Sequence, residues 1–215
     1  MARATPTRAS DSPRDAIALL KQDHRTVEAL FDEFEDADEG EQSSIAQRVC
    51  QLLTIHAQIE EEMLYPAAKE AFEEDDGDSE LVYEAEVEHG SAKELIARIE
   101  AMSGEEEQFA ATVKVLGEYI KHHVKEEEGQ LFPKLKKTEV DLSELGARLA
   151  DRKFALMEQM GISPEEEQPA QQRQRKRSTG SRSSRSGRSA SRARATGGRR
   201  SSKSARGSSG RSTRH

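Results

Sequence analysis

Four histidines and two glutamates recur at spacings that suit metal binding. Glu60 follows His56 by four residues, and Glu127 follows His123 by four residues. Side chains four residues apart on a helix leave from one face, with Cβ atoms roughly 6 Å apart, so each pair could reach one metal centre. A further histidine lies on an apolar stripe upstream of each pair. The candidate ligands are His24, His56, Glu60, His89, His123 and Glu127.

These residues belong to an internal repeat. The segment "HAQIEEEMLYP", which starts at His56, aligns without gaps with "HVKEEEGQLFP", which starts at His123. Upstream, "DHRTVEALF" contains His24 and "EHGSAKELI" contains His89. The repeat predicts two similar helical hairpins, each of which contributes one half of a pseudo-twofold site.

The ligand types favour iron, with manganese as a substitute. Imidazole and carboxylate ligands with open coordination positions suit these metals. A carboxylate can bridge two cations, so Glu60 and Glu127 could each be shared, whereas a single structural zinc would use only four ligands. The alternative is a set of hydrogen-bonded core histidines without a metal. Burying several imidazoles and carboxylates without partners is costly, which favours the metal.

Neighbouring polar residues are weaker candidates for contact with the metal centre. Tyr119 precedes His123 by one turn and could reach the centre or serve as a core tyrosine. His122 lies about 100° round the helix from His123, so it could contact the ligands only from outside or lie at the surface. Tyr65 aligns with Phe132, which suggests packing at a helix end. The glutamates in charged runs are expected to be solvated: Glu61, Glu62, Glu126 and Glu128.

The body must be helical to position these ligands. Apolar residues repeat in steps of three and four, and no alternating β pattern competes. We expect helices over 13–34, 45–66, 79–99 and 109–133, and a shorter one over 142–156. Ser12 and Ser79 are the expected caps of the first and third helices, and Ser103 with Glu106 has capping-box spacing before the fourth. Short connections predict an all-α, antiparallel, up-and-down four-helix bundle with a short fifth helix.

Charge divides the chain sharply. Fifteen of the 33 Lys and Arg residues lie between Gln168 and His215, where Asp and Glu are absent, which leaves 18 against all 41 acidic residues before that point. The net charge of −8 therefore hides an acidic body and a basic tail. The tail cannot bury enough apolar surface to offset its chain entropy. We expect a disordered N-terminus over 1–12, the bundle over 13–161 and a disordered Arg/Ser-rich basic tail over 162–215.

Several classes of protein are not supported. The chain has no membrane-span-length apolar stretch, no signal-peptide pattern, and no nucleophilic triad, phosphate loop or dinucleotide fingerprint. Its single cysteine, Cys50, cannot form an intramolecular disulfide and is expected to be buried and inert. A cytoplasmic location is the expectation.

The motifs resemble the hemerythrin-like HHE cation-binding family over roughly Asp15 to Lys137. The resemblance implies a bundle around two iron ions in a non-haem, oxo-bridged centre, with the six candidate residues as ligands. It also exposes two departures from oxygen-carrying hemerythrins. Lys93 stands where they have another histidine, and the spacing of Glu127 replaces their His-x-x-x-x-Asp.

The resemblance implies a small diatomic ligand or peroxide as the partner. Sensing or handling of oxygen, peroxide, nitric oxide or iron then competes with reversible oxygen carriage, and a catalase-like peroxide activity stays open. An alternative function is association with DNA or RNA through the basic tail, because Arg and Lys neutralise phosphates without reading sequence. A tail that is merely solubilising, or that folds back on the acidic body, is the competing interpretation.

Overall fold

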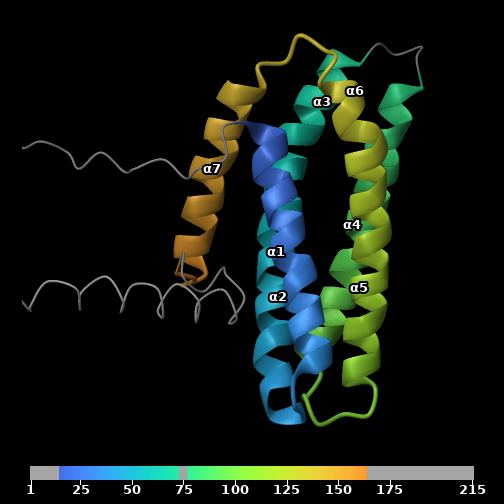
Figure 1. Ribbon diagram of the computed structural model, residues 1–215, viewed down its shortest axis with the longest axis vertical. Helices are drawn as coiled ribbons and strands as arrows, with labels where there is room; N and C mark the ends of the chain where they lie inside the picture. The colour runs from blue at the N-terminus through green and yellow to red at the C-terminus, as the bar shows by residue number, and fades with distance from the viewer. Residues whose placement is uncertain (1–14, 73–76, 164–215) are drawn as a thin grey trace, which may run out of the picture. The chain divides into compact units, whose positions relative to one another are not determined.

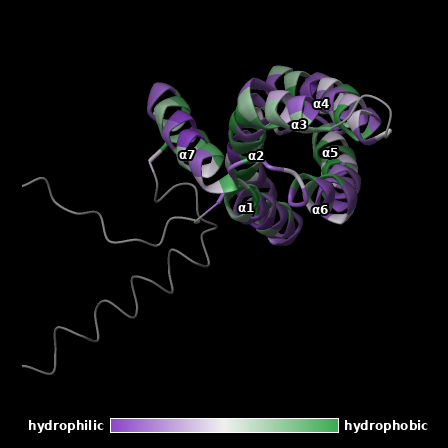
Figure 2. Ribbon diagram, turned by 90° about the horizontal axis from the view of Figure 1, so that it is seen from above, coloured by the Kyte–Doolittle hydropathy of each residue, from purple (hydrophilic) through white to green (hydrophobic). Residues whose placement is uncertain are grey.

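The computed structural model describes residues 15–72 and 77–163, and this part of the chain is helical without strands. The elements are α1 Ala16–Asp36, α2 Glu39–Ile59, η1 Glu60–Leu64, α3 Tyr65–Ala71, α4 Asp78–Ala101, α5 Phe109–Glu126, η2 Glu127–Leu131, α6 Phe132–Leu135 and α7 Leu142–Gln159. Two antiparallel hairpins, α1 with α2 and α4 with α5, form the bundle, and α7 lies outside it along α1 and α2 (Figures 1 and 2). The predicted four-helix bundle with a fifth helix is confirmed.

Local capping explains where the helices begin. The carboxylate of Asp15 accepts the N–H of Ala18 at 2.8 Å, and Asp38 and Asp141 cap α2 and α7 in the same way. Ser79 is not a cap, because α4 already begins after Gly77, whose φ of 68° suits glycine. The first helix was expected to begin at Ser12 and Pro13, but the N-cap of α1 is Asp15 and the helix begins at Ala16.

The fourth helix begins at Phe109, as the sequence predicted, but the capping-box residues do not cap it. Glu106 accepts the N–H of Ser103 at 2.8 Å, as the capping-box spacing suggested. These contacts stabilise a turn ahead of the helix, however, and the N-cap position of α5 is Gln108.

The two long central helices each change pitch at a candidate ligand. α2 passes into the π-helical turn η1 at Glu60, and α5 passes into η2 at Glu127. In each turn the closing N–H bonds to the carbonyl five residues back, from Tyr65 to Glu60 and from Phe132 to Glu127. The second helix therefore continues beyond Pro66, where the sequence predicted its end. Single π turns of this kind often occur at functional sites.

The polar ligands divide the apolar core into two clusters. One contains Leu20, Leu64 and Phe132 and extends under α7; the other contains Val27, Val49 and Leu116. The buried apolar side chains of both clusters line the interior of the bundle. The candidate ligands lie between the two clusters, so they are held on both sides by close-packed side chains.

The described body ends on a glycine cap. Gly161 has a φ of 70°, and the N–H of Ile162 bonds to the carbonyl of Met157 at 2.8 Å. Ile162 is buried, so the folded body extends one residue beyond the expected boundary at 161. The expectations for 1–12 and for the rest of the tail, from 164 onward, lie outside the described residues.

Two smaller expectations can be compared with the fold. Cys50 is buried, and burial raises the pKa of its thiol to about 12, so the thiol is inert at neutral pH. In the described ranges, no helix combines the length and apolar character needed to cross a membrane.

Candidate metal centre

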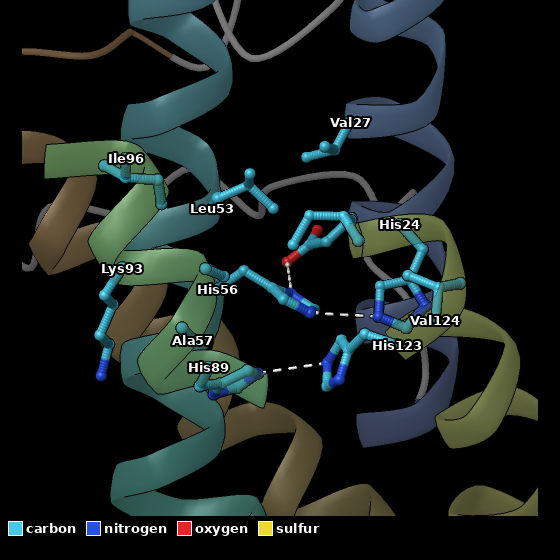
Figure 3. Close-up of a pocket in the computed structure, with 13 residues that line it drawn as sticks. His24, Val27, Leu53, His56, Ala57, His89, Lys93, Ile96, His123 and Val124 are labelled. Carbon is cyan, nitrogen blue, oxygen red and sulfur yellow. Dashed lines mark hydrogen bonds and ion pairs between the residues drawn. The ribbon is translucent and has the colours of Figure 1, made fainter. Parts of the chain in front are cut away.

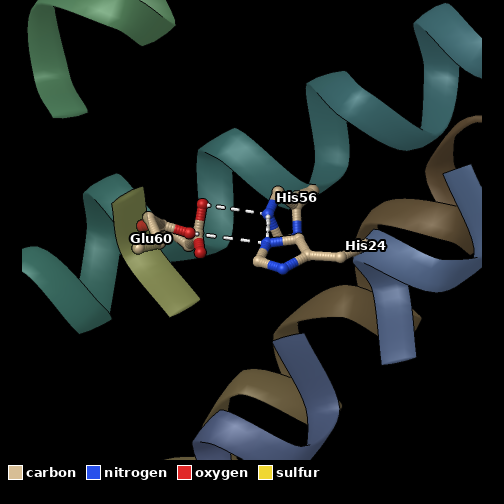
Figure 4. Close-up of side chains that lie close together, drawn as sticks. His24, His56 and Glu60 are labelled. Atoms are coloured by element: carbon tan, nitrogen blue, oxygen red, sulfur yellow. Dashed lines mark hydrogen bonds and ion pairs between the residues drawn. The ribbon is translucent and has the colours of Figure 1, made fainter. Parts of the chain in front are cut away.

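The four histidines turn their Nε2 atoms toward one point between the hairpins. The Nε2 atoms of His24 and His56 lie 3.1 Å apart, and those of His89 and His123 lie 3.2 Å apart. Figure 4 shows the rings of His24 and His56 turned toward one another beside Glu60. All four side chains are buried.

Each glutamate connects the two hairpins. Oε2 of Glu60 lies 3.2 Å from Nε2 of His56 and 3.4 Å from Nε2 of His89. Oε2 of Glu127 lies 3.4 Å from Nε2 of His24 and 3.6 Å from Nε2 of His123. The ligand atoms thus form two groups that share Glu60, one of His24, His56, Glu60 and Glu127, and one of Glu60, His89 and His123.

Unpaired buried oxygens indicate that a cation belongs here. Both carboxylate oxygens of Glu60 and Oε2 of Glu127 are buried without a hydrogen-bond partner among the described residues. Leaving such oxygens unpaired in a low-dielectric interior is expensive. Two adjacent cations would give every one of these atoms a partner, so the residues fit a two-metal site.

Burial and the neighbouring charges also shift the pKa values of the groups in the metal-free centre. Burial, together with the nearby charge of Glu127, raises the pKa of Glu60 well above its usual value. Burial also opposes the ionisation of Glu127, but the charges and hydrogen bonds of His123 and His24 hold its pKa below the usual range. Burial lowers the pKa of His56 to about 4, so its imidazole is neutral and can bind a metal.

A carboxylate faces the outer nitrogen of every histidine. Nδ1 of His24 lies 2.9 Å from Glu128, and Nδ1 of His89 lies 3.0 Å from Glu61. Both contacts join the two hairpins. Glu128 belongs to the second hairpin and faces His24 of the first, whereas Glu61 belongs to the first and faces His89 of the second. Such a carboxylate fixes the ring in the tautomer whose Nε2 can bind a metal. The expectation that Glu61 and Glu128 are merely solvated was wrong.

The other two histidines use carboxylates that precede a ligand in sequence. Nδ1 of His123 lies 2.7 Å from Oε2 of Glu88, and Nδ1 of His56 lies 3.6 Å from Oδ2 of Asp23. Sequence analysis missed both residues. The acidic residue before the upstream histidine in each repeat was the signal that could have revealed them.

A tyrosine reaches the centre from one half only. Tyr65 is fully buried, and its hydroxyl donates to Oε1 of Glu127 at 2.9 Å and lies 3.1 Å from Nε2 of His89. Phe132, its counterpart in the repeat, stacks on His24 with ring centroids 5.9 Å apart. The expectation that Tyr65 only packs a helix end was therefore incomplete.

The two residues proposed as outer contacts lie further away. Tyr119 is half-buried on α5, and among the described tyrosines Tyr65 is the one that contacts the ligands. The side chain of His122 is 62% exposed and lies 3.7 Å from Oε1 of Glu88. It therefore approaches the centre through Glu88, whose other oxygen lies 2.7 Å from Nδ1 of His123.

A small cavity adjoins all four histidines (Figure 3). It has a volume of about 20 Å³, and beyond the centre its walls are mostly apolar, with Val27, Leu53, Ala57, Ala92, Ile96, Ile120 and Val124. That volume accommodates a molecule of about the size of one water. Lys93 also lines the cavity, but its ammonium lies 2.6 Å from Glu61 and its side chain is 47% exposed.

The comparisons with known proteins agree with this geometry. The profile of the Hemerythrin HHE cation binding domain matches residues 15–135, more than half of the chain. The chain belongs to this hemerythrin HHE family. A solved structure of an HHE cation binding domain-containing protein from Mycobacterium kansasii has the same fold, with a TM-score of 0.56 at 22% identity, over 66% of this chain and 86% of that one. The protein is thus a hemerythrin-like, cation-binding helical domain.

One curated relative has a different kind of name. A protein called DNA nickase, from Nostoc sp. strain PCC 7120, is 30% identical over 115 residues. The match covers 53% of this chain but only 31% of that relative. The hemerythrin-like chain therefore spans about a third of the relative's length.

Proposed function

We propose that this hemerythrin-like protein binds two iron ions in a non-haem, oxo-bridged centre and senses or handles a small molecule there. The observation that carries the proposal is the position of Glu60. Its Oε2 lies within 3.4 Å of a histidine nitrogen from each hairpin. A carboxylate between two imidazole sets is what a pair of bridged metals requires.

The composition of the donor set supports iron. Four imidazoles and two carboxylates provide six ligands, which exceeds the four of a closed structural zinc site. Mixed nitrogen and oxygen ligation that leaves positions open suits iron or manganese. Lys93 pairs with Glu61 and does not supply a further imidazole, so the ligand set is poorer in nitrogen than that of the oxygen carriers.

The cavity restricts the size and polarity of the ligand. Oxygen, nitric oxide or peroxide fits a space of about 20 Å³ beside the histidines. The largely apolar wall favours a neutral ligand and limits access of bulk water. These properties support sensing or handling of such a molecule, in preference to turnover of a larger substrate.

The residues of the chain prepare the centre in three ways. A bound iron pair supplies electron exchange and an open coordination position. The outer carboxylates hold the imidazole tautomers, and Tyr65 keeps a hydroxyl proton beside Glu127 and His89. The apolar side chains of the cavity exclude water from the same place.

Anaerobic loading with iron tests the proposal. We expect two iron ions per chain, and optical spectra that change when oxygen, peroxide or nitric oxide is added in turn. The His56→Ala and Glu127→Ala variants should lose both the iron and the spectral response. A folded wild-type chain that takes up no iron after reconstitution would contradict the proposal, and peroxide turnover that survives in both variants would place that activity elsewhere.

A second function, association with DNA or RNA, rests on the tail. Fifteen cations without a carboxylate between Gln168 and His215 suit a polyanion, and a relative with a DNA-directed name matches part of the chain. We expect non-specific binding that weakens steeply with salt, since phosphate contacts release counterions. Deletion of 168–215 should abolish retention of duplex DNA at low salt. Unchanged retention by the truncated chain would count against this function.

A further inference from the structure

Helix α7 lies outside the four-helix bundle and C-terminal to the residues that the family model matches. The match to the HHE family ends at residue 135, whereas α7 covers Leu142–Gln159. It packs along α1, α2 and the η1 turn, and among the described elements no corresponding helix covers the α4–α5 hairpin (Figure 2). The two halves of an otherwise repeated structure therefore have different surroundings.

A buried ion pair connects α7 to a candidate ligand. Nζ of Lys153 lies 2.6 Å from Oδ1 of Asp23, and Oδ2 of the same carboxylate faces Nδ1 of His56 at 3.6 Å. The Lys153 side chain is 13% exposed and that of Asp23 is 6% exposed. The carboxylate of Asp23 therefore lies between the ammonium of Lys153 and the imidazole of His56.

The repeat supplies an internal comparison for this contact. Glu88 occupies the position of Asp23 in the second half and faces His123 in the same way. Its other oxygen, however, lies 3.7 Å from the exposed His122, and within 15–72 and 77–163 no lysine from a covering helix is paired with it as Lys153 is with Asp23. The lysines beside the remaining two outer carboxylates, Lys21 and Lys93, are more exposed than Lys153. Solvent screens exposed pairs more strongly, so the contact of Lys153 is the firmest of the three.

The position of α7 is itself fixed by close contacts. A Cβ on Gly146 would lie 2.6 Å from the backbone of Asp15 and Ala16, so α7 and the start of α1 approach as closely as glycine permits. The Arg152 guanidinium bonds to both carboxylate oxygens of Glu62, two residues after Glu60. Lys153 is consequently presented to Asp23 by a helix that the contacts of Gly146 and Arg152 hold in place.

We propose that Lys153 is a positioning residue that orients His56 through Asp23 and makes the two metal positions unequal. The inference rests on the proposed function, since it requires two bound ions. The position that uses His24 and His56 should hold its ion more tightly than the one that uses His89 and His123. Carboxylates that orient metal-binding imidazoles typically change metal affinity 10- to 100-fold, which sets the expected scale.

Release of Fe(II) to an excess of chelator tests this inequality in the full-length chain. After anaerobic loading, we expect two kinetic phases from the wild-type protein. Lys153→Met should accelerate the slow phase roughly tenfold and leave the fast phase unchanged. Lys153→Arg, which keeps the charge, should restore slow release, and Arg148→Met, at an exposed position of α7, should behave as wild type. Mössbauer spectra should show two iron signals, of which Lys153→Met alters one.

A double variant distinguishes faster iron release caused by lost positioning from faster release caused by a folding defect. Lys153→Met leaves Asp23 as an unpaired buried charge, which destabilises a protein. Asp23→Asn with Lys153→Met removes both charges, and it should fold by circular dichroism while still releasing the slow ion faster. Equal effects on both phases, no effect on either, or failure of arginine to restore slow release would overturn the inference. A wild-type chain that binds no iron would overturn the proposed function as well, whereas two ions released at one rate would overturn only the inference.

Discussion

The Tyr65 hydroxyl donates to Oε1 of Glu127 over 2.9 Å and thereby joins the first hairpin to a carboxylate of the second. In the other half Phe132 occupies the equivalent place and offers only a ring face, parallel to within 4° of His24. One half of the centre thus has a buried proton donor that the other lacks. The two equivalent aromatic residues differ by the hydroxyl group, which Tyr65 has and Phe132 lacks.

Removal of that hydroxyl should destabilise the metal-free protein. Tyr65→Phe leaves a buried carboxylate oxygen without its donor, which costs about 2 kcal/mol. Urea unfolding of the chelator-treated protein measures the loss. Tyr119→Phe is the matched control, because Tyr119 is only half-buried, and it should change the free energy of unfolding by less than about 0.5 kcal/mol. Equal stability of the Tyr65→Phe variant and wild type would show that the hydrogen bond contributes nothing.

The two glutamates should respond differently to replacement by glutamine. Glu60 has a strongly raised pKa and is neutral in the metal-free centre, so Glu60→Gln should unfold like wild type. Glu127 has a lowered pKa, and its charge is paired with His24 and His123, so Glu127→Gln should cost about 3 kcal/mol. Denaturant titrations at neutral pH compare the two. Both variants should bind fewer than two iron ions, whereas Glu118→Gln at an exposed position should bind two.

Iron binding should release protons from the centre. The pKa of Glu60 is raised in the folded metal-free protein, so the carboxyl keeps its proton until a cation displaces it. Iron affinity should therefore fall as the pH falls. Without iron, the folded state binds more protons than the unfolded one near neutrality, so this group lowers stability as the pH rises. An indicator dye in weak buffer measures the release, and Glu60→Gln should release at least one proton fewer; an equal release from both proteins would assign the proton to another group.

Tight packing of α7 gives a prediction that does not depend on metal. Gly146→Ala places a Cβ 2.6 Å from the backbone at Asp15 and Ala16, which forces the helices apart and costs about 1–3 kcal/mol. Gly90→Ala introduces the same methyl group into a helix where nothing lies within 4 Å, and should be neutral or stabilising. Thermal unfolding of the two variants separates the effects. A Gly146→Ala protein as stable as wild type would mean that α7 can shift freely.

The architecture and the six candidate ligands could be predicted from the sequence alone. Apolar periodicity determines which face of a helix is buried, and a histidine or glutamate on that face must lie in the interior. The duplication then placed His24 with His56, and His89 with His123, because each hairpin is built in the same way. Short loops sufficed to make the hairpins antiparallel.

Only the tertiary structure decided the contacts between elements that are distant in sequence. Glu128 faces His24 and Glu61 faces His89 because the hairpins pack against each other at one height, a register that no single helix encodes. The π turns at Glu60 and Glu127 were equally hidden, since they depend on how each long helix fits its neighbours. The candidate ligands themselves follow from local periodicity, which is a property of one helix. Their partners, including Tyr65 and Lys153, follow from packing, which is a property of the whole bundle.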